Sequence, residues 1–475
     1  MRGATREAEA ELGVMSVERL NAEDRFMLWP DEVWPQDIGA LVMLDGSRLI
    51  NPDGEFRIDA VRETVASRLH LVPRFRQLLY VPPRRLGGPL WVDAQTMDLA
   101  DHVATVPVPA PGDEAQLLLA VEELRRRRLE RSRPLWEMWF LTGLPENRVG
   151  LFMRMHHAMA DGMAALATIE RFLDTTGDVL PDPPRPWTPA PMPTESDLLR
   201  DKREQQRQQL RDALSALAHP MGPIRYRLAA WPALRELIAD RPLPVTSLHR
   251  VVGTDRTLAL IRGRLQHIRD VARTCDATVN DVLLTVTAGG LRGLLSSRGE
   301  PVDGVTVRIY VPVSLHPDAG AQTRGNLIGQ MAVPLPIGIA DPVARLRAIS
   351  RETAQRKMRI RPSLGRLPHG IAGRALLLLV KRQRVNVATT DIVGPDVPLY
   401  LAGARLLEVF PMVQLLGTVT LAIGGMSYAG QFNAMVVADA QSYPDIDTFT
   451  RCAQEELCTL AEVSRSLRTS RTSPS

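Results

Sequence analysis

The segment VGLFMRMHHAMADGMAALATIERFLD, Val149–Asp174, places a predicted strand, a short loop and a predicted helix in direct succession. Its apolar start, Val149–Met155, is typical of a buried strand. Apolar residues then recur at helical spacing from Met163 to Asp174. The heptapeptide HHAMADG, residues 156–162, therefore lies between two regular elements. Loops held in this way are where catalytic side chains are commonly found.

The two histidines of this loop are candidates for acid–base chemistry. Neighbouring side chains of an extended segment point to opposite sides, so we do not expect His156 and His157 to face one cleft. One is predicted to be a general base, because a neutral imidazole can accept a proton from an alcohol near pH 7. Asp161 is expected to fix the loop, and Gly162 permits a tight backbone where the helix begins. A metal site or two structural histidines is the competing interpretation, although no HExxH pattern or nearby cysteine supplies further ligands.

The rest of the chain predicts two mixed α/β halves. Upstream, Asp37–Asp45 is a predicted strand, Asp59–Val72 a predicted helix, and a hairpin between a strand from Phe140 and Val149–Met155 is expected to turn at Glu146-Asn147. Seven prolines between Pro181 and Pro193 exclude a helix or central strand there. Four regions follow: a disordered extension at 1–14, an N-terminal subdomain at 15–180, a Pro-rich linker and helical crossover at 181–245, and a C-terminal subdomain at 246–475.

Further elements are predicted from hydrophobic periodicity. The helices are Glu114–Leu129, Glu195–Leu217, Val279–Leu295, Ala344–Lys357 and Asp445–Arg468. The strands are Val305–Val313, Val333–Pro336, Leu399–Leu401, Val419–Ser427 and Phe432–Ala438, the last two joined by a turn at Ala429-Gly430. The arginine run Arg125–Arg128 is interpreted as a solvated helix end, with a contact to a cofactor phosphate as the alternative. An apolar stripe from Ile224 to Ile238, flanked by arginines, fits either a membrane contact or a helix that covers the core.

Composition excludes several classes of protein. The 475 residues are 45% hydrophobic and 24% charged, which is typical of a globular chain, and the net charge of +4 is too small to indicate nucleic-acid binding. Cys275, Cys452 and Cys458 form no CxxC pair, so a disulfide framework or cysteine zinc site is not expected, and a cytoplasmic location fits best. The uncharged run Val409–Ala438 is broken by proline and glycine, so we interpret it as buried strands rather than a membrane span.

The loop and four other segments resemble one family. HHAMADG resembles the HHxxxDG motif of the CoA-dependent acyltransferase superfamily, and its surroundings resemble the bacterial wax ester synthase/diacylglycerol acyltransferase family. The other segments are Pro134-Leu135-Trp136, similar to a PLW motif; Thr278–Asp281, similar to an ND motif; Val311–Pro317 with Gly325-Asn326, similar to VPVSxRP and GN; and Asp391–Leu415, similar to NVPGP and LAG.

This resemblance implies an α/β fold of two chloramphenicol-acetyltransferase-like, or condensation-domain-like, subdomains with a central tunnel. His157 matches the general base, and His156, Asp161 and Gly162 match the rest of its motif. Asn280 and Asp281 match a pair near the active site, and the PLW segment is a further candidate for substrate binding or support. Trp136 is alternatively a core anchor, and Asp281 alternatively favours a helix start. The oxyanion donor is expected among the amides near Gly162 or at the Asn280 side chain.

The implied activity is acyl transfer from a long-chain acyl-CoA to diacylglycerol, which forms triacylglycerol and CoA, with wax esters from fatty alcohols as a second product. Acyl-CoA is a substrate, and neither a cofactor nor a metal is expected. Because both substrates are poorly water-soluble, we expect peripheral association with the cytoplasmic membrane face or with lipid bodies. Asp37, Asp391 and Val393 depart from the family pattern, which commonly has His, Asn and Pro there, so they bear on substrate preference.

Three alternatives remain. A condensation-type enzyme would use carrier-bound acyl groups, but no LGGxS carrier serine is present. His156 and Asp161 also satisfy the Hx4D spacing of glycerol-phosphate acyltransferases, although the PLW segment and the lack of an FPEG-like block argue against that family. The third is a non-catalytic lipid-binding protein.

Overall fold

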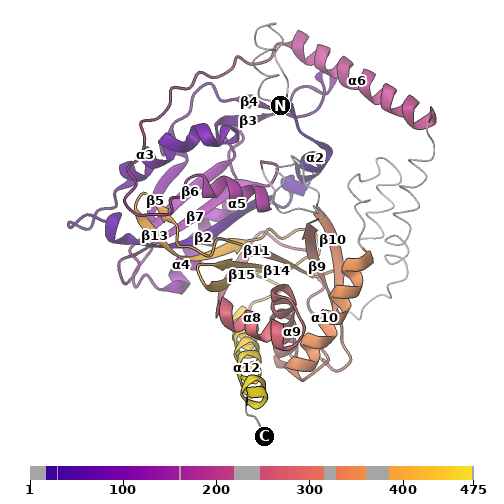
Figure 1. Cartoon of the computed structure of the whole chain (residues 1–475). Helices are drawn as coiled ribbons and strands as arrows, with labels where there is room; N and C mark the ends of the chain where they lie inside the picture. Colours follow the sequence, from indigo (N-terminus) through magenta and orange to yellow (C-terminus); the bar gives the residue numbers. More distant parts are fainter. Residues whose placement is uncertain are drawn as a thin grey trace.

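Two six-stranded sheets and a small three-stranded sheet form the framework of the computed structural model (Figure 1). The structure describes residues 18–28, 30–159, 162–218, 246–314, 328–359 and 385–472. In sheet order, the first large sheet consists of β12 (Tyr400–Leu401), β13 (Ala404–Met412), β2 (Asp37–Asp45), β7 (Arg148–His156), β6 (Trp136–Thr142) and β5 (Val103–Pro107). The second consists of β10 (Ile328–Leu335), β9 (Val307–Ser314), β11 (Val387–Val393), β14 (Leu421–Tyr428), β15 (Gln431–Asp439) and β8 (Arg256–Arg264). The small sheet has β1 (Glu18–Arg19), β4 (Leu90–Asp93) and β3 (Gln77–Tyr80).

Helices pack around these sheets. The helices of the N-terminal half and the crossover are α2 (Ala22–Leu28), α3 (Ile58–Arg68), α4 (Glu114–Arg126), α5 (Gly162–Glu170) and α6 (Glu195–Ala218). Those of the C-terminal half are α8 (Leu265–Thr274), α9 (Val279–Ser297), α10 (Pro342–Arg359) and α12 (Ile446–Thr472). Helices α8, α9 and α12 gather beside the second sheet, whereas α3 and α5 lie beside the first (Figure 1).

The two halves share strands. Strand β13 comes from the C-terminal half but pairs antiparallel with β2, so that Phe410 lies opposite Leu41. An apolar cluster joins the sheets, in which buried Phe152 of β7 lies among residues of both halves, including Leu260 and Met435. The first large sheet therefore contains strands from both sides of residue 246. The predicted boundaries of the subdomains stay a prediction.

The strand–loop–helix prediction around residue 156 is confirmed in its regular elements. Strand β7 lies between β2 and β6, and its side chains belong to different apolar clusters on the two faces of the sheet, which explains why nearly all of its residues are buried. Glu146 and Asn147 both have positive φ, 57° and 55°, and form the predicted hairpin turn between β6 and β7. Ala429 and Gly430, with φ of 44° and 81°, form the equivalent predicted turn between β14 and β15.

Other predictions needed correction. The strand expected from Phe140 begins at Trp136, and the helix expected to reach Val72 ends at Arg68 in a short 3-10 segment. Strands β8 and β11 were not predicted. The uncharged run 409–438 holds parts of three strands, as expected, and within the described ranges no helix has the length and apolarity to cross a membrane. The stripe Ile224–Ile238 lies outside the described residues.

Candidate active site

His157 occupies a turn directly after β7. Its backbone N–H donates to the Gln36 carbonyl at 2.8 Å, which extends the β2–β7 register by one pair beyond Asp37 and His156. Side chains therefore keep alternating through the two histidines. His156 lies on the face of Arg154, where it is 3% exposed, whereas the alternation places half-buried His157 on the face of Met155.

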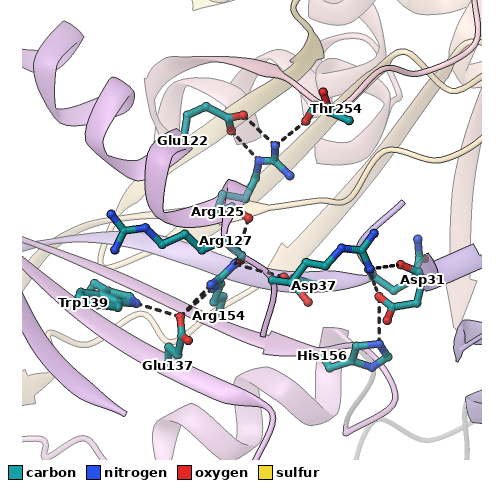
Figure 2. A network of polar contacts seen from close by, with 12 residues as sticks. Asp31, Asp37, Glu122, Arg125, Arg127, Glu137, Trp139, Arg154, His156 and Thr254 are labelled. Atoms are coloured by element: carbon teal, nitrogen blue, oxygen red, sulfur yellow. Dashed lines mark hydrogen bonds and ion pairs between the residues drawn. The ribbon is translucent and has the colours of Figure 1, made fainter. Parts of the chain in front are cut away.

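The buried histidine is hydrogen bonded through its backbone N–H and its Nδ1, and its Nε2 faces a carboxylate. The His156 backbone N–H donates to the Leu135 carbonyl at 2.9 Å, and its Nδ1 accepts from the Ala158 N–H at 3.0 Å. Its Nε2 lies 3.3 Å from a carboxylate oxygen of Asp31 (Figure 2). His156 is thus committed to the protein interior, and the predicted role of His157 as the general base stays a prediction.

The PLW segment lies at the start of β6, where it contacts the backbone of His156. Leu135 provides the carbonyl for His156, and Trp136 is fully buried. The Trp136 ring stacks on Phe75 and His102, with centroid distances of 4.7 and 4.5 Å, and its Nε1 donates to the Phe75 carbonyl. Trp136 is therefore a core anchor, which is the alternative interpretation of this residue. Pro134 lines a cavity of about 370 Å³ together with His102.

Asp281 is used at a helix start. Its carboxylate accepts hydrogen bonds from the Thr278 N–H and hydroxyl, both at 2.8 Å, and from the Thr353 hydroxyl at 2.7 Å. Together with the reciprocal bond from the Asp281 N–H to Thr278, these contacts form a capping box on α9. Asn280 is half-buried beside it. A role of this pair near the active site stays a prediction.

The remaining members of the motif are only partly described. Helix α5 begins at Gly162, as expected. Asp161 lies outside the described residues. Among the residues that the structure does describe, no three His, Cys, Asp or Glu side chains gather as a metal site, so the competing interpretation of the histidines as metal ligands gains no support there.

The arginine run Arg125–Arg128, at the end of α4, makes contacts within the protein. Arg125 is buried and binds Glu122 and the Thr254 carbonyl, so the prediction of a solvated helix end is wrong for this residue. Arg126 pairs with Asp255, and Arg127 pairs with Glu123. Arg128 donates to the carbonyls of Asp31 and Glu32. Arg126 and Arg127 are more than half exposed, so the predicted solvated helix end holds for these two, and a contact to a cofactor phosphate stays a prediction.

A buried charge network lies under the histidine turn and was missed from the sequence. Arg154 is 1% exposed and donates to Glu137 at 2.8 Å, to Asp37 at 3.3 Å and to the carbonyls of Arg125 and Arg127 (Figure 2). The available signal was a single charged residue inside an otherwise apolar strand, since such a residue is rarely buried without partners.

Burial affects the two acidic groups of this region differently. Burial raises the pKa of Asp37 to about 6, although Arg154 opposes the change. Burial would also raise the pKa of Asp31, but contacts with His156, the Gln36 amide and Arg131 outweigh it and hold that pKa well below its usual range. Asp31 is therefore ionised at neutral pH, and Asp37 titrates in the folded protein near pH 6.

Replacing Asp37 by asparagine is expected to change how stability depends on pH. Because the folded-state pKa is raised from 3.8 to about 6, wild type has the full benefit of a neutral Asp37 below about pH 4 and loses it as the pH rises through 6. The loss is about 3 kcal/mol. Urea unfolding at pH 4 and pH 7 should show that wild type loses this much stability relative to D37N. Parallel pH profiles of the two proteins would contradict the expectation.

Comparison with known protein families places these elements in context. The wax ester synthase/diacylglycerol acyltransferase catalytic domain matches residues 20–283, and the corresponding C-terminal domain matches residues 324–461. A Mycobacterium tuberculosis protein named "probable diacylglycerol O-acyltransferase tgs1" is 29% identical, over 91% of this chain and 93% of its own length. A second diacylglycerol O-acyltransferase by name, from the same organism, is 30% identical over 89% of this chain and 92% of its own length.

Solved structures share the architecture. The wax ester synthase/diacylglycerol acyltransferase from Marinobacter aquaeolei VT8 superposes with a TM-score of 0.66 at 23% identity, over 94% of this chain and 99% of that chain. The starter condensation domain of rhizomide synthetase superposes with a TM-score of 0.59 at 14% identity, over 96% of both chains. These similarities confirm the predicted fold class, whereas the central tunnel stays a prediction.

Proposed function

Since the chain belongs to the wax ester synthase/diacylglycerol acyltransferase family, we propose that it transfers a long-chain acyl group from acyl-CoA to diacylglycerol and forms triacylglycerol. The catalytic-domain match spans residues 20–283 and so contains the whole HHAMADG loop. The Mycobacterium tuberculosis relatives that align over nearly the whole chain are named for this activity.

His157 is the proposed general base. It takes the proton of the diacylglycerol hydroxyl as that oxygen attacks the thioester carbonyl, and the carbon–sulfur bond then breaks. The proton passes to the CoA thiolate, so the imidazole returns to its neutral form. The observation that supports this role most strongly is the difference between the two histidines: His156 is 3% exposed and bonded within the fold, whereas His157 is half-buried at the end of the strand.

Residues that stabilise the oxyanion are proposed from the motif. A hydrogen-bond donor at the developing negative charge is typically worth about 3 kcal/mol of transition-state stabilisation. The amide groups at the start of α5, which begins at Gly162, and the Asn280 side chain at the start of α9 are the candidates. Asp161 is proposed to support the loop.

Release of CoA thiol from palmitoyl-CoA tests the function. Wild type is expected to release CoA only when an acceptor is present, with diacylglycerol, hexadecanol and no acceptor compared side by side and the lipid product identified. Triacylglycerol should form in the diacylglycerol reaction. If folded wild type releases no CoA with any acceptor, the proposed activity is wrong, and carrier-bound acyl groups or a non-catalytic role become the alternatives.

The same comparison addresses wax ester formation. The family name includes this activity, and we propose it as a second reaction with fatty alcohols. The departures at Asp37, Asp391 and Val393 bear on acceptor preference. Burial raises the pKa of Asp391, near the end of β11, to about 6, so this position holds an ionisable group where the family commonly has an amide. The ratio of the diacylglycerol and hexadecanol rates measures the preference.

Membrane association is proposed to be peripheral, at the cytoplasmic membrane face or at lipid bodies. Both substrates are poorly water-soluble, and the arginine-flanked stripe Ile224–Ile238 is the proposed contact. Glutamate at Trp231 and Leu234 is expected to reduce the fraction of protein that floats with vesicles of phosphatidylglycerol and diacylglycerol. As a control, glutamate at Leu210 and Leu214, which are exposed on α6, should leave flotation unchanged. Equal flotation of all three proteins would exclude the stripe.

A further inference from the structure

We propose that Asp31 is the residue that positions His157, and that it does so by fixing the histidine turn through two separate routes. The inference rests on the proposed function of His157. Asp31 belongs to a short 3-10 segment, Pro30–Glu32, and is far from the HHAMADG loop in sequence. In the fold it lies directly beside His156 (Figure 2).

The first route runs through the His156 ring. Because Nδ1 accepts a hydrogen bond from the Ala158 N–H at 3.0 Å, this nitrogen is unprotonated. The neutral imidazole therefore has its proton on Nε2, which is 3.3 Å from the Asp31 carboxylate. Asp31 thus favours the one tautomer of His156 that can hold Ala158, the residue that follows His157. Loss of this contact frees the ring to rotate or to change tautomer.

The second route runs through the backbone of Gln36. The Gln36 N–H donates to a carboxylate oxygen of Asp31 at 2.9 Å, and the Gln36 carbonyl accepts from the His157 N–H at 2.8 Å. Gln36 is fully buried, so its backbone groups have no water to replace a lost partner. One carboxylate therefore fixes the chain on both sides of the His157 side chain.

Asp31 is itself held in place. It is 7% exposed, and its second carboxylate oxygen lies 2.9 Å from Arg131. Arg128 donates to the Asp31 and Glu32 carbonyls, which ties the 3-10 segment to the end of α4. The carboxylate thus has an opposite charge on one side and the histidine turn on the other, and a residue fixed in this way can orient a catalytic group.

Steady-state kinetics of two substitutions tests the proposal. D31A is expected to lower kcat by about 10- to 100-fold, because a misplacement of about 1 Å at a reacting group can cost that much. KM for palmitoyl-CoA should change by less than about threefold, since Asp31 does not meet the substrate. D31N keeps an oxygen that accepts from His156 and Gln36, so it should recover most of the lost rate while remaining about 3- to 10-fold below wild type. E32A removes an exposed neighbour in the same segment and should match wild type.

Hydrogen exchange of the turn gives a readout that does not depend on activity. Peptides covering residues 156–159 should exchange faster in D31A than in wild type or E32A. The proposal is overturned if folded D31A keeps both wild-type kcat and wild-type exchange. If D31A does not fold, D31N takes its place, and a kcat equal to that of E32A overturns the proposal. If wild type itself releases no CoA, the proposed function fails instead, and the exchange rates alone decide whether Asp31 holds the turn.

Discussion

Replacing His157 by alanine is expected to lower kcat for acyl transfer by about 10²- to 10⁴-fold, the usual contribution of a general base. Without the imidazole, water or the bound alcohol itself must accept the proton of the attacking hydroxyl. KM for palmitoyl-CoA should remain close to that of wild type, because the base acts in the transition state rather than in binding. The measurement is CoA release with diacylglycerol as the acceptor, with triacylglycerol quantified as the product.

A matched histidine makes this result specific. His267 is exposed on α8, so H267A removes an imidazole from the same chain without touching the turn. H267A should keep wild-type turnover, and thermal unfolding of both variants checks that the loss of activity in H157A is not a loss of folding. Wild-type turnover in H157A would move the catalytic role elsewhere. A protein that only binds lipid would keep its lipid binding in H157A and show no turnover in any variant.

The strand–loop–helix unit could be predicted because its signals are local. Apart from Arg154, Val149–Met155 carries no charged or polar side chain, as expected for a strand buried on both faces, and the helical spacing resumes directly after the loop. The turn at Glu146-Asn147 was also predictable, since asparagine tolerates the positive φ that such a turn needs. These elements need no knowledge of the rest of the chain.

The pairing of β13, from the C-terminal half, with β2 of the first sheet could not be predicted in the same way. Most residues of β13 are buried, including the last four in succession, and nothing local says that its partner is β2, more than 350 residues earlier. Register between distant strands depends on which apolar faces meet after the chain has folded. The pairing of Phe410 with Leu41 is therefore a property of the assembled core.

The candidate site shows the same limit. The histidines were found from their motif, but Asp31 was not, because its contact with His156 joins residues 125 positions apart. The network around Arg154 likewise draws its partners from β2, from β6 and from the end of α4. Only the charge inside an apolar strand was visible in the sequence, and it predicts that partners exist without saying which they are.

Replacing Arg154 by methionine is expected to lower the free energy of unfolding by about 3–5 kcal/mol, because it leaves buried acidic groups without their partner. Glu137 and Asp37 would both lose an ion pair, and two backbone carbonyls would lose a donor. Methionine fills much of the same volume, so the loss reflects charge rather than a cavity. Urea unfolding at pH 7 measures it.

The control comes from the same strand. Arg148 pairs with Glu146 at 2.7 Å near the surface, where its side chain is 41% exposed. An exposed pair of this kind is typically worth about 0–1 kcal/mol, so R148M should be close to wild type in stability. Equal losses for R148M and R154M would mean that the buried network contributes no more than a surface ion pair.

Combining R154M with D37N separates the cost of the unpaired charge from the loss of packing. Without Arg154, the pKa of Asp37 is expected to rise further, because Arg154 is the cation that most strongly opposes the effect of burial on this pKa. The stability of R154M should therefore fall more steeply than that of wild type as the pH rises above 6. Asparagine at Asp37 carries no charge, so the double variant should recover about 0.5–3 kcal/mol at pH 7, the usual range for directly coupled residues. Strictly additive losses would show that Arg154 does not stabilise the protein through Asp37, and would leave Glu137 and the two carbonyls as the groups that require it.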